Sequence, residues 1–260
     1  MLTRTFIHLP RVGTATEVHF WRQGLHTWAD FLAARSVAGI GPHRLQALQR
    51  ALEKSLEHLD QPAYFGNRLP APERWRLFEQ FRARTAYLDI ETTGSNWPNL
   101  AVTVIGLFDG RTCHQFVLGD NLWDFLEIID QFQVLVTYNG AQFDLPVLQA
   151  FFGGRPFRQT HIDLRFVLAR LGFKGGLKKI ETQFGLARPS DLAGLNGYDA
   201  VLLWERARRG DREARQTLLR YNREDIINLE PLMVQAYRLA CRLALAGISP
   251  PPPINPDFPA

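Results

Sequence analysis

Acidic residues at strand and helix spacing mark the first candidate site in this 260-residue chain. The stretch "YLDIETTG", residues 87–94, reads as a buried strand apart from its two acids. Because strand side chains alternate between faces, Asp89 and Glu91 point to one side while Leu88 and Ile90 point to the other. Two adjacent carboxylates repel each other unless a positive charge lies between them. The spacing therefore predicts a positive charge between these two side chains and leaves its nature open.

Two later stretches carry further acids. In "YNGAQFDLPVL" Asp144 lies in the first turn of a helix that directly follows a strand. In "YNREDIINLE" Tyr221 and Asp225 are four residues apart, so they share one face of a helix, with Glu224 nearby on the same side. Each stretch alone is commonplace, since acids at helix starts and on solvated helix faces are frequent. Their occurrence in one chain, in this order, is more specific.

The combination resembles the DEDDy class of 3′–5′ exonucleases, which share a ribonuclease H-like fold. Proofreading domains of family-B polymerases carry the same three patterns. The stretches "NRLPAPERWRLFEQFRARTAYLDIETTG", "HIDLRFVLARLGFKGGLKKIE" and "RYNREDIINLEPL" are more similar to the stand-alone predicted exonucleases often called YprB-like. The resemblance covers roughly residues 65–240 and includes all four family carboxylates and the tyrosine.

The resemblance implies a metal-dependent 3′–5′ exonuclease. Asp89, Glu91, Asp144 and Asp225 would hold two divalent cations, Mg²⁺ or Mn²⁺, which take oxygen ligands and clamp an in-line displacement. Tyr221 would orient the attacking water, because its ordinary pKa of about 10 makes it a poor base at neutral pH. The expected substrate is a nucleic acid with a free 3′ end, single-stranded, with DNA favoured over RNA.

Two other functions remain open from the sequence. One is a structure-selective endonuclease, and the other is a non-catalytic nucleic-acid-binding protein on the same fold. A silent site has no reason to keep four mutually repelling acids, which argues against the second. The sequence leaves the biological pathway and the oligomeric state open.

Several residues near the acids are candidate substrate contacts. Thr92 and Thr93 follow the strand carboxylates, where the resemblance implies contact with the 3′-terminal nucleotide. Asn139 and Phe143 would touch the terminal base or sugar, although turn formation and packing explain them equally well. Asp163, in "HIDL", is expected to cap a helix.

A basic segment adds one more candidate. Residues 155–188 hold 8 Lys and Arg against 2 Asp and Glu. Within it, "KGGLKKIE" puts Lys178 and Lys179 at the start of a helix, where either can meet the substrate backbone. A solvated helix face accounts for these lysines just as well.

The elements that position these residues indicate an α/β fold with a mixed sheet flanked by helices. Strands are expected at 101–108 and 113–118, joined by a hairpin at Asp109-Gly110, and at 133–138. Helices are expected at 72–83 and 121–130, and the part after Asp144 is mostly helical. Pro231 is expected to kink or split the last helix.

The front of the chain predicts a small all-α module, with helices at 14–24, 27–35 and 42–59. Its stretch "VAGIGPHRLQAL" resembles the hairpin of helix-hairpin-helix DNA-backbone binders, so Gly39, Gly41 and Arg44 are candidate phosphate contacts. The stretch "HLPRVGTATEVHFW" looks like a second copy, with Arg11 in place of the first glycine. A plain helical bundle is the alternative.

Charge and composition agree with this division. Residues 1–84 hold 12 Lys and Arg against 7 Asp and Glu, whereas residues 85–260 hold 18 against 19. A basic module beside an acidic cluster suggests a polyanionic partner. The predicted boundaries are 1–64 for the helical module, 65–246 for the exonuclease domain and 247–260 for a Pro-rich tail.

Localisation is predicted to be cytoplasmic. Two cysteines exclude a disulfide framework and fit a reducing cytosol. No signal peptide is visible at the start, and the longest apolar region, 231–248, is interrupted by polar and charged residues, which predicts no membrane span.

Overall fold

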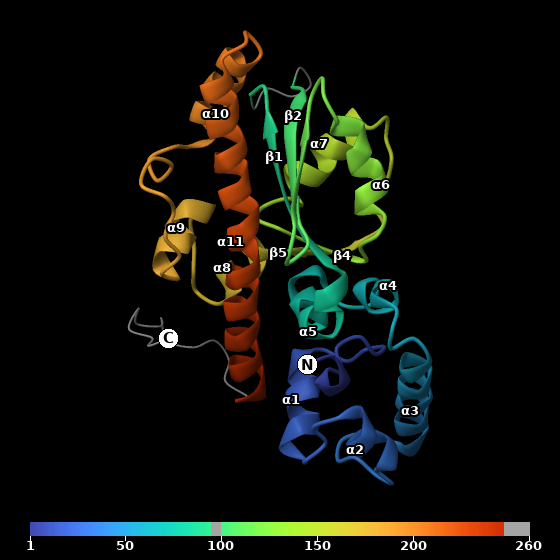
Figure 1. Cartoon of the computed structure of the whole chain (residues 1–260). Coiled ribbons are helices and arrows are strands. Elements are labelled where there is room, and N and C mark those ends of the chain that lie inside the picture. The colour runs from blue at the N-terminus through green and yellow to red at the C-terminus, as the bar shows by residue number, and fades with distance from the viewer. Residues whose placement is uncertain (95–99, 247–260) are drawn as a thin grey trace.

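Within the residues that the structure describes, 1–94 and 100–246, five strands form one mixed sheet (Figure 1). This computed structural model places β1 in the centre, in the strand order β3-β2-β1-β4-β5. The strands are β1 (Thr85–Thr92), β2 (Val102–Phe108), β3 (Cys113–Val117), β4 (Val134–Thr137) and β5 (Thr160–Asp163). The predicted Pro-rich tail, 247–260, lies outside the described residues.

The sheet is mixed because its two halves are connected differently. β1, β2 and β3 are antiparallel neighbours, whereas β4 pairs in parallel with β1 and β5 pairs in parallel with β4. The predicted hairpin joins β2 to β3. Asp109 Oδ1 accepts hydrogen bonds from the backbone N–H groups of Arg111 and Thr112, at 2.7 and 2.6 Å, and Gly110 has a φ of 90°. The predicted α/β fold is confirmed.

Helices cover both faces of the sheet (Figure 1). The short helix α6 (Phe125–Ile129), which a 3₁₀ turn at Leu122–Asp124 precedes, and α7 (Asp144–Phe151) pack on one face. The other face carries α8 (Leu164–Arg170), α9 (Leu177–Gln183) and the long α11 (Arg212–Leu245), against which α10 (Gly197–Ala207) packs. Leu88 and Ile90 belong to the α6–α7 core, so the alternation predicted for β1 is confirmed.

The helix α11 continues through Pro231, so of the two outcomes predicted there, a kink or a split, the split is wrong. A proline inside a helix loses one backbone hydrogen bond and costs about 3 kcal/mol. Leu229, Leu232 and Met233 flank it and are fully buried. Burial of each of these three side chains contributes about 1.5–3 kcal/mol to stability. Their sum exceeds the cost of the proline, so the helix stays packed on the sheet.

The segment before β1 differs in detail from the prediction. A short helix, α4 (Pro62–Gly66), lies in this segment. The expected helix 72–83 is a 3₁₀ helix (Ala71–Leu77), α5 (Phe78–Phe81) and a second 3₁₀ turn (Arg82–Arg84). Trp75, Phe78 and Phe81 are all buried. Their spacing of three residues matches the three-residue repeat of a 3₁₀ helix better than the 3.6-residue repeat of an α-helix.

The front helices form as predicted. They are α1 (Thr14–Arg22), α2 (Trp28–Ala33) and α3 (Pro42–Glu57), after a 3₁₀ turn at Leu2–Arg4. A capping box between Thr27 and Asp30 begins α2. The two similar turns also correspond in structure: Arg11 and Gly39 both have left-handed backbones, with φ of 58° and 76°.

The front module shares its hydrophobic core with the rest of the chain. One cluster of buried side chains includes Phe6, Phe20 and Leu52 together with Leu232 and Ala236. The predicted boundary after residue 64 stays a prediction. In the described parts of the chain, no helix is both long and apolar enough to span a bilayer.

A buried ionic network joins the same two regions. Arg76, which is 2% exposed, contacts Glu17 of α1 at 3.0 Å and Glu73 at 2.8 Å. Arg170 of α8 reaches the other oxygen of Glu73, also at 2.8 Å. Removing one partner of a buried pair leaves an uncompensated charge, so this network ties α1 firmly to the segment before β1 and to α8.

Candidate active site

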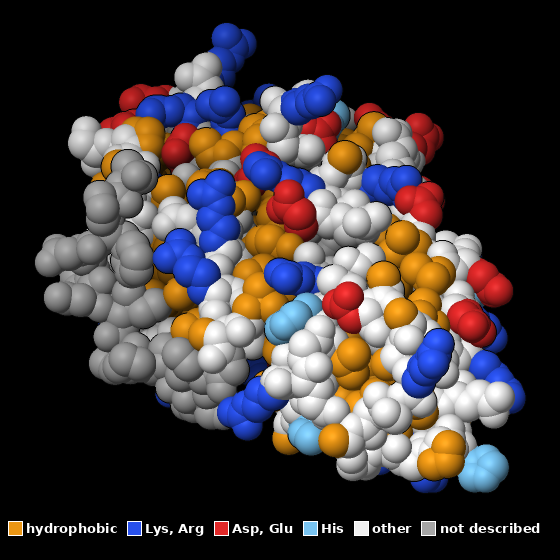
Figure 2. All heavy atoms as spheres, turned by 90° about the horizontal axis from the view of Figure 1, so that it is seen from below, with side chains coloured by type: hydrophobic (Ala, Val, Ile, Leu, Met, Phe, Trp, Pro, Cys, Tyr) orange, Lys and Arg blue, Asp and Glu red, His pale blue; other side chains and the backbone are white. Residues whose placement is uncertain are grey.

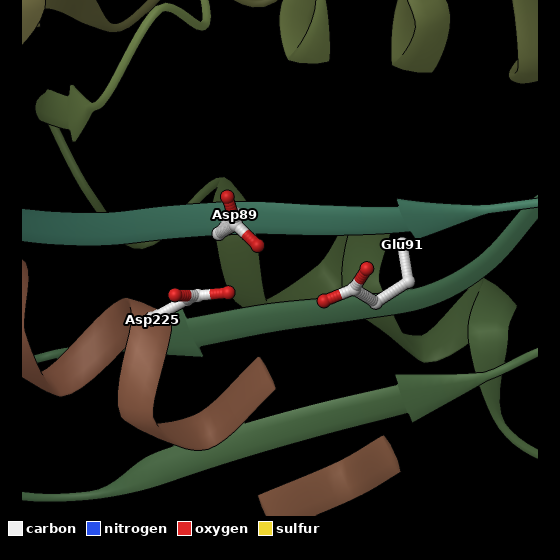
Figure 3. A group of neighbouring side chains, drawn as sticks. All are labelled: Asp89, Glu91 and Asp225. Carbon is white, nitrogen blue, oxygen red and sulfur yellow. The ribbon is translucent and has the colours of Figure 1, made fainter. Parts of the chain in front are cut away.

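Three carboxylates meet between the central strand and the long helix (Figure 3). Asp89 and Glu91 come from β1 and Asp225 from α11, and each offers an oxygen within 4.8 Å of the others. Glu91 and Asp225 are buried, while Asp89 is half-buried. Asp225, and not the neighbouring Glu224, joins this cluster. The geometry matches what alternation along the strand and the helix spacing predict.

Gly106 of β2 allows the helix to come this close to the sheet. It pairs with Asp89 across the antiparallel strands. A Cβ atom at this position would lie 2.2 Å from Asn222 Oδ1 and 3.0 Å from Ile226 Cγ2. The missing side chain therefore leaves the space that α11 occupies.

Asn222 is a site residue that the sequence analysis missed. It is fully buried, its Nδ2 lies 3.4 Å from Asp89 Oδ2, and its Oδ1 accepts a hydrogen bond from Gln115 Nε2 at 3.2 Å. It thereby orients one carboxylate of the cluster. Its position three residues before Asp225 puts it on the same helix face, and this spacing was the signal available.

Asp144 lies beside the cluster without joining the group that meets within 4.8 Å. It is the first residue of α7, it is 5% exposed, and its Oδ1 accepts a hydrogen bond from the backbone N–H of Ile90 at 3.2 Å. The structure thus brings the fourth predicted carboxylate next to β1. There it forms a hydrogen bond with Ile90, the residue between Asp89 and Glu91.

Burial and mutual repulsion weaken the acidity of these carboxyl groups. Burial, followed by the charges of the neighbouring carboxylates, raises the pKa of Asp89 and of Glu91 well above their ordinary values. Burial raises the pKa of Asp144 to about 7. Burial also raises the pKa of Asp225, although the positive charge of Arg188 opposes the shift. Crowded carboxyl groups of this kind gain most from a bound cation.

Tyr221 projects from the same face of α11 as Asp225. Lys178 of α9 donates a hydrogen bond to its hydroxyl group, and the Lys178 Nζ atom lies 4.3 Å from the ring centroid. Burial, and then the charge of Asp225, raises the pKa of Tyr221. The hydroxyl therefore stays protonated at neutral pH and serves as a hydrogen-bonding group. These residues and Asp89 line a cavity of about 290 Å³.

Arg188 is a second residue that the sequence analysis missed. It lies between α9 and α10, and its side chain is 5% exposed. Nε and Nη2 donate to the two oxygens of Glu181, both at 2.6 Å, and Nη2 also donates to Asp225 Oδ1. Its partners are 7 and 37 residues away along the chain, so no local spacing reveals it.

The two predicted threonine contacts use their hydroxyl groups within the chain. Thr92 Oγ1 donates to the backbone oxygen of Gly94 at 2.6 Å, and Thr93 Oγ1 accepts from the backbone N–H of Ala101 at 3.0 Å. Both bonds shape the end of β1 next to Glu91.

The loop before Asp144 is clamped by residues from β5 and α8. Asp163 caps α8, as predicted, and its two oxygens also accept from the backbone N–H groups of Asn139 and Ala141, at 2.8 and 3.0 Å. Asn139 has a left-handed φ of 69°, and its Oδ1 accepts from Arg165 at 2.5 Å. The predicted contact Phe143 is half-buried against the α6–α7 core.

The front-module candidates lie at the far end of the molecule from the tip of β1 (Figure 1). Gly39 shapes the turn before α3, and Gly41 is the N-cap of that helix. Arg44 Nη2 donates to the backbone oxygen of Arg11 at 3.1 Å, which ties the two similar turns together.

The donor set fits hard divalent cations. All three clustered groups are carboxylates, and oxygen is the ligand atom that Mg²⁺ and Mn²⁺ take. Glu91 Oε1 is buried and has no hydrogen-bond partner among the described residues. A buried acceptor left unpaired costs free energy, which a metal ion at this position would recover.

Comparisons with known proteins agree with the fold. A search of curated proteins found no match. The family B DNA polymerase from the hyperthermophilic archaeon Pyrobaculum calidifontis is a structural neighbour, with a TM-score of 0.50 and 18% identity. The match covers 64% of this chain but only 27% of the polymerase chain. The family model of the RNase H superfamily matches residues 86–237, more than half of the chain. The chain therefore belongs to the RNase H superfamily.

Proposed function

We propose that this protein is a metal-dependent 3′–5′ exonuclease of the DEDDy type, similar to the YprB-like enzymes, that hydrolyses terminal phosphodiesters of single-stranded nucleic acid, with DNA favoured over RNA. The observation that carries the proposal is the meeting of Asp89, Glu91 and Asp225 within 4.8 Å of one another. Tyr221 and Asp144 beside them complete the five residues expected of this class.

The proposed chemistry depends on two divalent cations, Mg²⁺ or Mn²⁺, held by Asp89, Glu91, Asp225 and Asp144. When bound, such a pair activates water and stabilises the leaving 3′ oxygen. The protonated hydroxyl of Tyr221 orients the water by a hydrogen bond. Lys178, bonded to that hydroxyl, supplies a positive charge toward the substrate backbone.

The substrate end is expected to lie along the tip of β1 and the start of α7. Thr92 and Thr93 would meet the terminal nucleotide through their backbone groups, because their hydroxyls already bond within the chain. Asn139 and Phe143 would border the terminal base or sugar. The clamp by Asp163 holds this border in place.

The front module is proposed to grip the phosphate backbone through the turn at Gly39 and Gly41 and through Arg44. The left-handed backbone of Arg11 supports this proposal, since it gives the turn at Arg11 the same form as the turn at Gly39. Figure 2, which looks onto the front helices, shows Lys and Arg side chains interspersed with acidic and apolar ones. The grip would therefore depend on a few positions and not on a uniformly basic face.

A product assay tests the proposed activity. DNA and RNA single strands labelled at the 5′ end are incubated with the protein and Mg²⁺, Mn²⁺ or EDTA. We expect a ladder that shortens one nucleotide at a time, with metal only. Asp89→Ala should abolish it, whereas Tyr221→Phe, which loses one hydrogen bond, should slow it by about ten- to a hundredfold.

The control for the assay is Asp191→Asn, an exposed acid paired with Arg220, which should keep full activity. Labelled mononucleotide released at once would mean attack from the 5′ end. Internal oligonucleotides would indicate an endonuclease, and binding without products would indicate a non-catalytic protein. Full activity in EDTA would refute the metal-dependent mechanism.

A further inference from the structure

Arg188 forms a hydrogen bond with Asp225 Oδ1, an oxygen that would bind a metal ion in the proposed site. Its guanidinium donates to Asp225 Oδ1 and to both oxygens of Glu181, and all three side chains are at most 7% exposed. Among the described residues, this is the ion pair that the structure forms with the three clustered carboxylates. Lys178, which lines the cavity together with Asp225, bonds to the hydroxyl of Tyr221 instead.

The two contacts of Arg188 are unequal. Toward Glu181 the guanidinium uses two parallel bonds, the side-on arrangement that gives the strongest arginine–carboxylate pairs. Asn228 Nδ2 holds the same Glu181 from the other side, at 3.0 Å. Toward Asp225 there is a single bond from Nη2. Glu181 thus anchors Arg188, and the contact with Asp225 can be lost while the guanidinium stays paired.

We propose that Arg188 is a built-in counter-ion that competes with divalent cations for Asp225 and thereby sets the cation affinity of the site. This inference rests on the proposed metal-dependent function. Without a cation, the guanidinium neutralises part of the buried negative charge. A cation that binds Asp225 displaces one hydrogen bond, and Arg188 remains bonded to Glu181. Its Nη1 group, which has no hydrogen-bond partner among the described residues, can then form a new bond.

Calorimetric titration of the full-length protein with Mn²⁺, without substrate, tests the proposal. Arg188→Gln removes the competitor, so the Kd for Mn²⁺ should fall about tenfold or more, as expected for loss of a hydrogen bond between charged groups. In EDTA the variant should melt earlier than the wild type, because Asp225 and Glu181 lose their counter-ion. The rise in Tm on adding Mn²⁺ should be larger than in the wild type.

Glu181→Gln provides the opposite test. It weakens the anchor while keeping the guanidinium, so Arg188 should bind Asp225 more firmly and the Kd for Mn²⁺ should rise. The matched control is Lys178→Gln, which removes a positive charge from the cavity that Asp225 lines, at a side chain that bonds to the Tyr221 hydroxyl and not to a carboxylate. Its effect on the Kd should be clearly smaller than that of Arg188→Gln.

Several outcomes would overturn the inference. One is that Arg188→Gln binds Mn²⁺ as the wild type does or more weakly. Another is that Lys178→Gln lowers the Kd for Mn²⁺ as much as Arg188→Gln does. A third is that none of the proteins binds Mn²⁺. If Arg188→Gln does not fold, unchanged or tighter binding by Glu181→Gln overturns it. The titration contains no substrate, so the two proposals can fail separately. If Arg188→Gln binds Mn²⁺ more tightly than the wild type but the wild type cuts no nucleic acid, only the proposed function is refuted. An active wild type with an unchanged Kd in the variant refutes only the role of Arg188.

Discussion

At the scale of single residues, Asp144 makes the metal-free protein sensitive to pH. Its folded pKa of about 7 lies above the ordinary value of 3.8, so its ionisation opposes folding. That cost is full above pH 7 and disappears as the pH falls toward 4. We expect Asp144→Asn to raise the free energy of unfolding in EDTA at pH 8 by on the order of a few kcal/mol, and to have little effect near pH 4.

Denaturant unfolding of wild type and variant across this pH range measures the difference. Asparagine keeps an oxygen that can accept the hydrogen bond from Ile90, so the comparison isolates the charge. Mg²⁺ should stabilise the wild type more than the variant at pH 8. A difference between the two proteins that does not depend on pH would contradict the raised pKa.

At the scale of elements, the packing of α11 on the sheet depends on Gly106. A methyl group there would lie 2.2 Å from Asn222 Oδ1, so the helix or the strand must shift. Overpacking of this kind costs about 1–3 kcal/mol. We therefore expect Gly106→Ala to lower the Tm and to reduce the proposed nuclease activity by at least about tenfold, because Asp225 moves relative to β1.

Thermal melts and initial rates measure both effects. Gly197→Ala, in the first turn of α10, is the matched control, since nothing lies within 4 Å of the added methyl group. It should leave the rate unchanged. A Gly106→Ala protein with wild-type activity and Tm would show that α11 tolerates a displacement from the sheet.

At the scale of the whole molecule, the front module is joined to the RNase H-like region through a shared core and through Arg76. Deleting the module would expose that core, so a point variant separates binding from folding. If the module grips phosphate, Arg44→Glu should weaken single-strand binding in the presence of Ca²⁺. It should also flatten the log–log salt dependence of binding by about 0.7–0.9 for each lost phosphate contact.

Arg50→Glu makes the same charge change at an exposed position of the same helix, α3, and serves as the control. Fluorescence anisotropy at several salt concentrations gives the slopes. Equal slopes for Arg44→Glu and the wild type would rule out the gripping role. An equal loss of single-strand binding affinity in the two variants would mean that only the net charge of the module contributes to binding.

Much of the fold and of the candidate site could be predicted from local patterns. Alternation along β1 predicted that Asp89 and Glu91 face the same way, and helix spacing predicted that Tyr221 and Asp225 do so too. The hairpin at Asp109-Gly110 and the cap by Asp163 were predicted as well. These features depend on residues within a few positions of one another, and backbone geometry alone determines them.

Only the tertiary structure decided how these segments meet. It placed Asn222 against Asp89 across 133 residues of sequence, and Arg188 between Glu181 and Asp225. It also turned Asp144 toward the amide of Ile90 and filled the space above Gly106 with α11. Such contacts depend on how one long helix lies across a sheet, and no short stretch of sequence encodes that packing because its partners are far apart along the chain.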